Sequence, residues 1–543
     1  MNTSKKLTYV ILANSSKLKY WQWKCLDLLA DLPVEPVLYV INNSKKTQPK
    51  GILSKFKNYP IQNLLFKQFL KSAKIKALEE IEFLENNSVE VLNVSVKKEG
   101  YNEYFPDEAI EKIRNLKPDF ILRFGFNILK GEILNVAKYG VWSFHHNDEQ
   151  IIRGGPPVFW EIKNRENYCG AILQKLTQRL DAGIILQKGK FQLHNHAFFY
   201  SWNELLLQST YFVRKTCLEI LSGNTQKIEA DLIKTKAKIY KFPRNWEFLE
   251  FLVVKNLNKL KFYWQNNFIE EKWEIALIDK PIHDFHKTEF LKDFKQLTFS
   301  DDEFCADPFG IDVNGHKKVL FEKFSYNQRI GQLFSFDYNT STSKKLNIIN
   351  DKNYHYSYPF TLSIDNKIYV VPECFESKKL DLFEFNSTLN TMTWIKTLIE
   401  NEAIVDSSLI FHNTKWWIFC SKNEYSSSHL YLYFADSLFS EFKAHLQNPI
   451  KIDVCSARMA GNIIIKDGKL FRPGMNNSFT YGGNIIIHEI IKLNETEFEE
   501  IPVRVLNSPS KVFSKGIHTI SKFGNQTLID FKKEFFSLTK NIK

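Results

Sequence analysis

The chain has 543 residues, of which 44% are hydrophobic and 25% are charged, with 21 glycines and 17 prolines. This composition excludes global disorder and collagen-like repeats, and the length is typical of about two to four globular domains. The formal net charge is +12, but the lysines are scattered along the chain. The charge therefore predicts no nucleic-acid partner and suits phosphate-bearing small substrates instead.

The cysteines and the apolar runs indicate the compartment. None of the seven cysteines forms a Cys-x-x-Cys pair, which argues against a disulfide framework and a zinc site. The first apolar run, Tyr9–Ala13, fits a buried strand better than a signal-peptide core. No apolar run reaches the roughly 18 residues of a membrane helix. We therefore expect a cytoplasmic protein with reduced thiols, no metal and no membrane insertion.

The first third of the chain alternates between strand and helix patterns. Strands are expected at 7–13, 37–41, 120–124 and 141–144, and helices at 21–31, 108–116 and 129–137. This alternation predicts a mostly parallel sheet covered by helices. Functional sites in such sheets form at the carboxyl ends of the strands. Further helices are expected at 200–222 and 246–265, joined by lysine-rich polar sequence.

The pattern changes near Lys272, where short aromatic and β-branched runs follow one another without helices between them. Such runs predict an all-β domain, either a sandwich or a propeller. The segments 362–373 and 463–473 share a strand–turn–strand pattern, and repetition of this kind favours the propeller. The predicted organisation is an α/β domain at 1–235, a helical connector at 236–270 and a β-propeller at 271–543.

The largest group of chemically active residues lies between 139 and 186. A strand carrying Ser143 ends at His145, a polar loop leads to Arg153-Gly154-Gly155-Pro156-Pro157, and Leu180-Asp181-Ala182-Gly183 follows. This ordered set resembles the formyltransferase family, which includes methionyl-tRNA formyltransferase and the sugar N-formyltransferases. The resemblance covers roughly residues 5–235 and implies a Rossmann-like fold with 10-formyltetrahydrofolate as formyl donor.

The resemblance also implies roles for individual residues. His145 would move a proton or stabilise the oxyanion, Asp181 would orient it, and Ser143 would complete the oxyanion site. The segment Phe120–Leu134 resembles the one along which the family binds its folate. The residues expected to bind the cofactor are Phe126, Ile128, Leu129, Arg153 and Gly154.

Two departures from the family pattern concern the expected site. Ser143 stands where the family has asparagine, which alters the oxyanion site. The loop at 146–150 reads His-Asn-Asp-Glu-Gln, where the family has a Pro-Ser-Leu-Leu-Pro type of sequence. Both the folate contact and the choice of acceptor depend on these positions. Arg153 has two interpretations, which are binding of a substrate anion and fixing of the loop by hydrogen bonds.

The β-rich region carries scattered acidic motifs in which Asp307, Glu373, Asp406 and Arg458 are the candidate ligand residues, with Glu322 as a further possibility. The set resembles the N-terminal module of the glucosamine inositolphosphorylceramide transferases, itself similar to five-bladed arabinanase-like propellers. We expect the three carboxyl groups of Asp307, Glu373 and Asp406 to converge within about 6–10 Å around a central cavity. Alternatively, acidic residues at strand ends cap turns or form buried ion pairs.

The sequence thus predicts a five-bladed propeller after a formyltransferase-like domain. The predicted function is transfer of a formyl group to the amino group of a nucleotide-linked amino sugar in surface-glycan biosynthesis, with a propeller that recognises glycan. One alternative is a glycan-binding protein whose formyltransferase-like domain is inactive. The other is a glycoside hydrolase that acts through the propeller. The expected partners are the amino-sugar substrate and a glycan.

Overall fold

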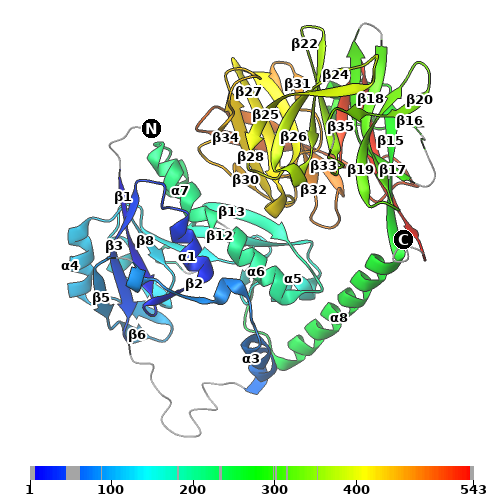
Figure 1. Ribbon diagram of the computed structural model, residues 1–543. Coiled ribbons are helices and arrows are strands. Elements are labelled where there is room, and N and C mark those ends of the chain that lie inside the picture. Colours follow the sequence, from blue (N-terminus) through cyan, green and yellow to red (C-terminus); the bar gives the residue numbers. More distant parts are fainter. Residues whose placement is uncertain are drawn as a thin grey trace. The chain divides into compact units, whose positions relative to one another are not determined.

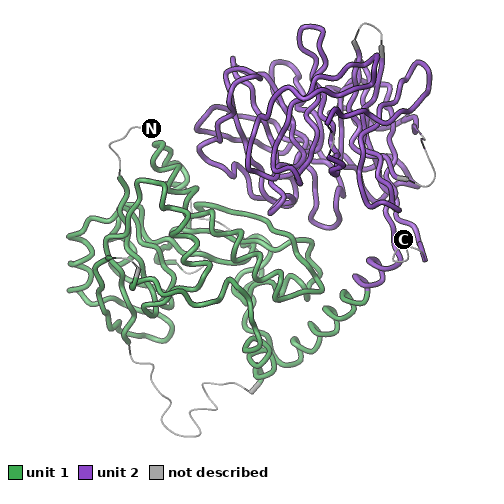
Figure 2. The backbone as a smooth tube through the Cα atoms, viewed as in Figure 1, with its two compact units in different colours: residues 1–260 green, residues 261–543 purple. Residues whose placement is uncertain are grey.

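The computed structural model describes residues 6–44, 61–86, 88–179, 183–230, 235–297, 299, 303–313, 316–350 and 352–538. The chain divides into two compact units, residues 1–260 and 261–543 (Figure 2). The division lies within helix α8 (Asn245–Phe268), whereas the sequence placed a separate connector at 236–270. Each unit is described by itself below.

Unit 1 is built on a seven-stranded sheet (Figure 1). Five strands are parallel, and the last two, β12 and β13, are antiparallel to their neighbours. The strands in sheet order are β13 (Ile184–Gln192), β12 (Tyr168–Lys175), β10 (Val141–His145), β8 (Phe120–Arg123), β1 (Leu7–Ala13), β3 (Val34–Asn42) and β5 (Val91–Val94). The mostly parallel sheet expected from the alternating pattern is therefore present.

Helices pack on this sheet because successive side chains of a strand point to opposite faces. Val10 and Leu12 of β1 belong to the same buried cluster as Ile110 and Ile113 of α4 (Asp107–Leu116). Helices α6 (Phe198–Gln208) and α7 (Tyr211–Leu221) pack against β12 and β13 and against α1 (Tyr20–Asp27). The predicted strands and most of the predicted helices of the first third occur within a few residues of their expected bounds.

Two helix predictions were wrong. Residues 129–137 form strand β9 (Ile128–Lys130) and a 3-10 turn (Glu132–Leu134), because Gly131 between them has φ +80°, a value that favours glycine and interrupts a helix. Residues 200–222 form two helices instead of one. The hydroxyl groups of Ser209 and Thr210 donate to the carbonyls of Leu206 and Leu207, and such bonds compete with helix continuation.

The end of unit 1 lies beyond the expected boundary at 235. Strand β14 (Lys238–Tyr240) pairs in parallel with β11 (Ile152–Gly154). Phe248 and Phe251 of α8 are buried, and the ring centroid of Phe251 lies 4.5 Å from that of Phe159 in α5 (Phe159–Asn164). Residues of the expected connector are therefore part of the core of unit 1.

Unit 2 consists of five β-sheets. The first combines β15 (Ile269–Ile278) and β16 (Phe294–Leu297) with β35 (Ile520–Phe523) and β36 (Gln526–Phe536). The second holds β17 (Glu303–Val313), β18 (His316–Ser325), β19 (Ile330–Asp337) and β20 (Thr342–Lys345). The third holds β21 (Asn347–Ile348), β22 (Ser357–Ile364), β23 (Lys367–Glu373), β24 (Lys379–Asn386) and β25 (Thr391–Glu400).

The remaining two sheets follow in chain order. The fourth holds β26 (Ile404–His412), β27 (Lys415–Lys422), β28 (His429–Ala435), β29 (Lys443–Ala444) and β30 (Lys451–Ile452), which pairs with β28. The fifth holds β31 (Ile464–Lys466), β32 (Lys469–Asn476), β33 (Asn484–Leu493) and β34 (Phe498–Leu506). Nearly all strand pairs are antiparallel, which agrees with the short connections that the sequence shows.

The five sheets are joined in a closed ring. Strand β15, the first of the unit, pairs with β36, the last, over its whole length. Hydrogen bonds link the remaining neighbours: Thr361 Oγ1 to Gly310 O at 3.1 Å, Asp406 N to Glu373 Oε2 at 2.9 Å, and Asn462 N to Ile520 O at 3.0 Å. An ion pair between Arg458 and Asp406 and a contact between His518 and Asp307 complete the links.

Among the helices of the described ranges, none has the length and apolar character that crossing a membrane would require.

Candidate functional site

A cavity of about 320 Å³ lies at the carboxyl ends of β8 and β10 in unit 1. This is the edge of a parallel sheet where sites are expected. Strand β8 ends at Arg123 and β10 ends at His145. The lining residues are Arg123, Asn127, Ile128, Leu129, Lys130, Ser143, Phe144, His145, Gly154, Gln174, Leu176, Thr177, Arg179 and Gly183.

Ser143 and Arg123 form a hydrogen-bonded pair in the wall of this cavity. Arg123 Nη1 donates to Ser143 Oγ at 2.8 Å, and Nη2 donates to the carbonyls of Phe126 at 2.8 Å and Asn127 at 2.7 Å. Arg123 Nε is buried and has no hydrogen-bond partner among the described residues. The same guanidinium group thus holds both the Ser143 hydroxyl and the backbone of Phe126 and Asn127, which precede β9.

Arg123 was not among the residues predicted from the sequence. A signal was present, because this arginine ends the otherwise apolar run Phe-Ile-Leu-Arg at the carboxyl edge of the predicted sheet. Burial lowers the pKa of the Arg123 guanidinium from its ordinary value, but arginine remains charged in proteins at neutral pH. The cavity therefore has one fixed positive charge next to the hydroxyl that stands at the family's asparagine position.

The two adjacent histidines have different surroundings. His145 lines the cavity, whereas the ring centroid of His146 lies 5.1 Å from that of Trp21 and 5.6 Å from that of Phe144. Burial, and to a lesser degree the neighbouring His145, lower the pKa of His146 to about 3. His146 is therefore a neutral ring packed among aromatic side chains.

The loop that departs from the family pattern is part of the fold. Asn147, Asp148 and Glu149 are buried. Asn147 Nδ2 donates to Glu161 Oε1 at 2.9 Å, and Lys188 Nζ lies 2.6 Å from Asp148 Oδ1 and 3.0 Å from Glu149 Oε1. Burial raises the pKa of Glu161 to about 7. These polar residues pair with one another inside the fold, but Glu149 Oε2 and Glu161 Oε2 are buried and have no hydrogen-bond partner among the described residues.

The residues expected to bind the cofactor divide into two groups. Ile128, Leu129 and Gly154 line the cavity. Phe126 is not among the residues that line the cavity, because its side chain lies in the same buried cluster as residues of β1, with its ring centroid 5.0 Å from that of Phe105; its contact with the cofactor stays a prediction. Arg153 Nε donates to Ala237 O at 2.9 Å, which supports the interpretation that it fixes the loop.

Gly154 and Asp181 are the remaining residues that the sequence predicts for this site. A Cβ atom at Gly154, whose φ is +87°, would lie 2.0 Å from Tyr240 O, so the close pairing of β11 with β14 requires glycine. Asp181 lies outside the described residues, and its role in orienting His145 stays a prediction.

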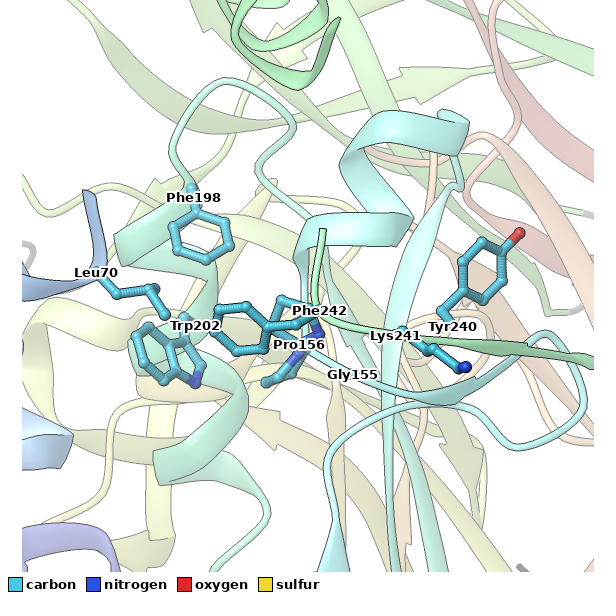
Figure 3. Close-up of a pocket in the computed structure, with 9 residues that line it drawn as sticks. Leu70, Gly155, Pro156, Phe198, Trp202, Tyr240, Lys241 and Phe242 are labelled. Atoms are coloured by element: carbon cyan, nitrogen blue, oxygen red, sulfur yellow. The ribbon is translucent and has the colours of Figure 1, made fainter. Parts of the chain in front are cut away.

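Unit 1 has a second cavity of about 380 Å³, and Gly155, which follows Gly154 in the chain, is one of its lining residues. The side chains of Leu70, Phe198, Trp202 and Phe242 gather around it (Figure 3). Leu70 comes from α3 (Leu64–Lys71) and Phe198 and Trp202 come from α6. Its lining is mainly apolar ring and aliphatic surface, which suits an apolar or aromatic group and not a charged one.

In unit 2, charged side chains from all five sheets or the loops beside them form one buried cluster. Its members are Asp307 on β17, Glu322 on β18, Glu373 on β23, Asp406 on β26, Arg458 before β31, His518 before β35 and Asp530 on β36. The structure therefore brings together Asp307, Glu373, Asp406 and Arg458, the four candidates named from the sequence. His518 and Asp530 were missed, because neither lies in an acidic motif.

The members of this cluster bind one another. His518 Nδ1 lies 2.7 Å from Asp530 Oδ2, and His518 Nε2 lies 3.4 Å from Asp307 Oδ1. Thr519 Oγ1 donates to Asp307 Oδ1 at 2.7 Å. Arg458 Nε donates to Asp406. The ligand atoms of Asp307, His518 and Asp530 lie within 4.8 Å of one another, and His518 Nδ1 makes no hydrogen bond of regular geometry among the described residues.

Asp307, Tyr358 and Asp406 occupy equivalent positions in three successive sheets. Each has a positive φ (52°, 42° and 46°) and lies at a bulge in the first long strand of its sheet. Bulges redirect side chains, and here they direct two carboxylates and a phenol toward the cluster. Tyr358 is fully buried, with its hydroxyl 2.9 Å from Ser408 Oγ.

Burial raises the pKa of Glu322 and of Glu373 well above the ordinary value, and nearby carboxylates add to both shifts. Burial also raises the pKa of Asp307 to about 6. In contrast, Asp530 and Asp307 raise the pKa of His518 although its burial opposes this. A raised pKa favours the protonated form of a carboxyl group, which can donate a hydrogen bond as well as accept one.

Comparison with known proteins gives relatives for unit 2. The family model "Glucosamine inositolphosphorylceramide transferase 1, N-terminal" matches residues 293–519. Glucosamine inositolphosphorylceramide transferase 1 of Oryza sativa subsp. japonica is 33% identical over 212 residues, which are 37% of this chain and 28% of the relative. The protein of the same name from Arabidopsis thaliana is 28% identical over 211 residues. The chain spans less than a third of the length of these relatives.

A different relative is the methionyl-tRNA formyltransferase of Clostridium tetani, which is 31% identical over 194 residues, 32% of this chain and 59% of the relative. Both families seen in the sequence are thus represented. Among solved structures, the α-L-arabinofuranosidase of Podospora anserina has a TM-score of 0.30 and 13% identity, covering 41% of this chain and 78% of that chain. The family 117 glycoside hydrolase of Zobellia galactanivorans has a TM-score of 0.32 and 11% identity, covering 49% and 91%.

Proposed function

We propose that unit 1 transfers a formyl group from 10-formyltetrahydrofolate to the amino group of an amino sugar, and that unit 2 is a five-bladed propeller that recognises a glycan. The observation that carries the first part is the cavity at the end of β10. Ser143, His145, Ile128, Leu129 and Gly154, all named from the formyltransferase resemblance, line this one cavity. The partial match to methionyl-tRNA formyltransferase supports the same chemistry.

The residues of the cavity fit a folate-type donor. Its volume of about 320 Å³ is in the range of small-molecule sites, which combine apolar walls with a few fixed polar groups. Ile128 and Leu129 supply apolar surface, and Arg123 has a buried Nε–H without a partner in the described ranges. The bound donor would supply an activated formyl group.

The side chains of the cavity have separable roles in this chemistry. His145 would accept the proton that the attacking amine must lose, because imidazole titrates near neutral pH. Ser143 accepts a hydrogen bond from Arg123 at 2.8 Å, and its own O–H donates to Phe144 O over a long distance of 3.5 Å; in the proposed reaction the O–H would turn to donate toward an oxygen that gains negative charge. The Arg123 charge strengthens this donation, so the pair takes the place of the family's asparagine.

The acceptor is proposed to be a nucleotide-linked amino sugar. The net charge of +12 favours anionic substrates over neutral ones. Lys130 and Arg179 in the cavity lining supply local positive charge for a phosphate group. The mainly apolar second cavity beside Gly155 offers ring surfaces for an uncharged part of the acceptor.

The test measures formyl transfer directly. The protein is incubated with 10-formyltetrahydrofolate and a panel of nucleotide-linked amino sugars, and products are identified by mass. We expect one acceptor to gain a formyl group and His145→Ala to lower turnover by about 10²–10⁴-fold. The control is His283→Ala, which removes an exposed histidine of unit 2 and should leave turnover unchanged.

Two results would overturn the proposal for unit 1. Failure of a folate analogue to bind the folded protein would exclude the donor. Binding of the analogue without transfer to any acceptor would favour an inactive formyltransferase-like domain, the first alternative. Near-normal turnover in folded His145→Ala would remove the proposed role of that residue.

The ring of five sheets and the buried charged cluster support the second part of the proposal. Each of the five sheets, or a loop beside it, contributes a side chain to the cluster, as blades do around the axis of a propeller. Mutual pairing of Asp406 with Arg458, and of Asp307 with His518, favours recognition over hydrolysis. A hydrolase needs one carboxylic acid and one carboxylate that are both directed at substrate. Release of sugar from an arabinan or galactan by the purified protein would favour the hydrolase instead.

A further inference from the structure

Helix α8 has a continuous row of exposed apolar side chains. Trp246, Leu249, Val253, Leu257, Leu260 and Trp264 are between 53% and 67% exposed. Successive residues of an α-helix are rotated by about 100°, so these six lie within a sector about 80° wide. We call this row the α8 stripe. The two buried residues of the helix, Phe248 and Phe251, lie on the opposite side, so the helix already contacts its own chain there.

The exposed apolar area of the α8 stripe is larger than that of most apolar patches on the surface of a monomeric protein. Six large side chains that are half to two-thirds exposed offer on the order of 500–700 Å² of apolar surface. Contiguous patches of this size mark interaction surfaces, and a standard interface buries about 800 Å² on each partner. The helix has 24 residues and is therefore about 36 Å long, which is enough for a helix pair.

The charges along α8 are separated by sign. Glu247 and Glu250 are the acidic residues of the helix, and both lie in its first half, whereas Lys255, Lys259 and Lys261 lie further on. Two helices in parallel would place like charges at the same level, which is unfavourable. Of these residues, Glu250 and Lys261 flank the α8 stripe on a helical projection, whereas Lys255 and Lys259 lie toward the side of Phe248 and Phe251. Two helices in antiparallel orientation would place the level of Glu250 near that of Lys261 of the partner subunit.

We propose that the α8 stripe binds the same stripe of a second copy of this chain, in antiparallel orientation. The stripe is self-complementary, as a two-fold symmetric interface requires. With Trp246 level with Trp264 of the partner subunit, Val253 lies opposite Leu257 of the partner subunit. In this register Lys261 of the partner subunit lies between the levels of Glu247 and Glu250.

The angular positions agree with this register. On a helical projection Glu250 and Lys261 lie on the same side of the α8 stripe, about 20° apart. In an antiparallel helix pair, flanks on the same side face each other, so the two residues meet across the interface. Glu250 also pairs with Lys163 of its own chain at 2.8 Å, and it stays half exposed with 52% of its side chain accessible, so it can bind both lysines.

The first experiment is sedimentation velocity of the full chain over about a hundredfold concentration range. We expect a concentration-dependent dimer. Val253→Asp with Leu257→Asp should raise its dissociation constant at least about 100-fold, because charges then enter the centre of the interface. The matched control is Asn266→Asp, which adds a carboxylate on the opposite, exposed side of the same helix and should leave the dimer unchanged.

The second experiment tests orientation. Chains with Val253→Cys are mixed with chains carrying Leu257→Cys; an antiparallel pair gives disulfides between the two kinds of chain, whereas a parallel pair gives disulfides within each kind. Separately, Lys261→Glu and Glu250→Lys should each weaken the dimer about 3–10-fold, and the double variant should regain most of the loss.

A monomer at all concentrations, or a dimer that survives Val253→Asp with Leu257→Asp, would overturn the proposal. Crosslinks within each kind of chain would overturn the antiparallel arrangement. Stripe-dependent binding of the monomer to vesicles of anionic phospholipid would assign the α8 stripe to a membrane surface instead, since its lysines and tryptophans also suit that environment.

Discussion

Single residues decide the chemistry of the cavity in unit 1. Ser143 stands at the family's asparagine position, and the structure places the guanidinium of Arg123 2.8 Å from its hydroxyl. A hydroxyl is shorter than a carboxamide and donates a single hydrogen bond. In the proposed reaction, the fixed charge of Arg123 would compensate for the smaller number of hydrogens that the hydroxyl can donate. The substitution at 143 is therefore best understood together with Arg123 and not as a loss on its own.

His146 predicts a pH dependence of stability. Its pKa is about 3 in the folded protein and ordinarily 6.5, so between these values the unfolded chain binds a proton that the folded chain does not. Proton binding to His146 in the unfolded chain does not lower the free energy of unfolding above about pH 6.5. The free energy of unfolding falls as the pH decreases from there toward 3. His146→Phe should reduce the decline in the free energy of unfolding over this range, measured by urea unfolding at several pH values.

The control for this prediction is His283→Phe, which replaces an exposed histidine. It should keep the pH dependence of the unaltered protein. An unchanged slope in His146→Phe would show that His146 is protonated in the folded protein and that its aromatic surroundings do not exclude the charge.

At the scale of elements, one buried ion cluster joins two neighbouring sheets of unit 2. Glu500 on β34 binds Arg472 on β32 through Nη2 at 2.6 Å and Nε at 2.7 Å, and it lies 2.6 Å from Lys451 on β30. The Arg472 side chain is completely buried. Although burial opposes the shift, Arg472 and Lys451 hold the pKa of Glu500 below its usual range.

Removal of this carboxylate should destabilise unit 2. Glu500→Gln leaves the buried Arg472 charge uncompensated, and we expect a loss of about 3–5 kcal/mol of unfolding free energy. Because the folded-state pKa is lowered, the stabilisation is present above about pH 4.5 and is lost in more acidic solution. Urea unfolding followed by circular dichroism measures the loss. Glu499→Gln, whose side chain is 55% exposed, should change stability little, and an equal loss in both variants would contradict the prediction.

At the scale of the whole molecule, the two units have separate cores. The buried clusters of unit 1 and of unit 2 draw on different parts of the chain, and strand β15 begins at Ile269, where it pairs with Phe536 near the end of β36. Fragments 1–268 and 269–543 should therefore each fold, with α8 kept whole in the first. Circular dichroism should show mixed α/β structure in the first and β structure in the second.

The fragments also test how much the units depend on one another. If neither fragment folds alone while the full chain does, the two units share a core and the boundary is misplaced. If only 269–543 folds, unit 1 needs contacts that the second half of the chain supplies.

The sequence by itself determined the kinds of most elements of unit 1. Apolar periodicity predicted the strands β1, β8 and β10 because each is a short buried run. The resemblance to formyltransferases named Ser143, His145 and Gly154, which line one cavity. The sequence prediction misplaced the helix at 129–137, because a positive φ at Gly131 is not visible in a hydrophobic pattern.

The tertiary structure alone decided which polar residues meet. Arg123 joins Ser143 across two neighbouring strands, and His518 joins Asp307 across more than 200 residues of chain. Local sequence patterns do not encode such pairings, since they depend on sheet order and ring closure. The same holds for α8: the sequence predicts a helix, but only packing decides that Phe248 and Phe251 are buried while the α8 stripe faces outward. Apolar residues occur on both sides of this helix, so its composition could not distinguish the side that packs on unit 1 from the side left for a partner.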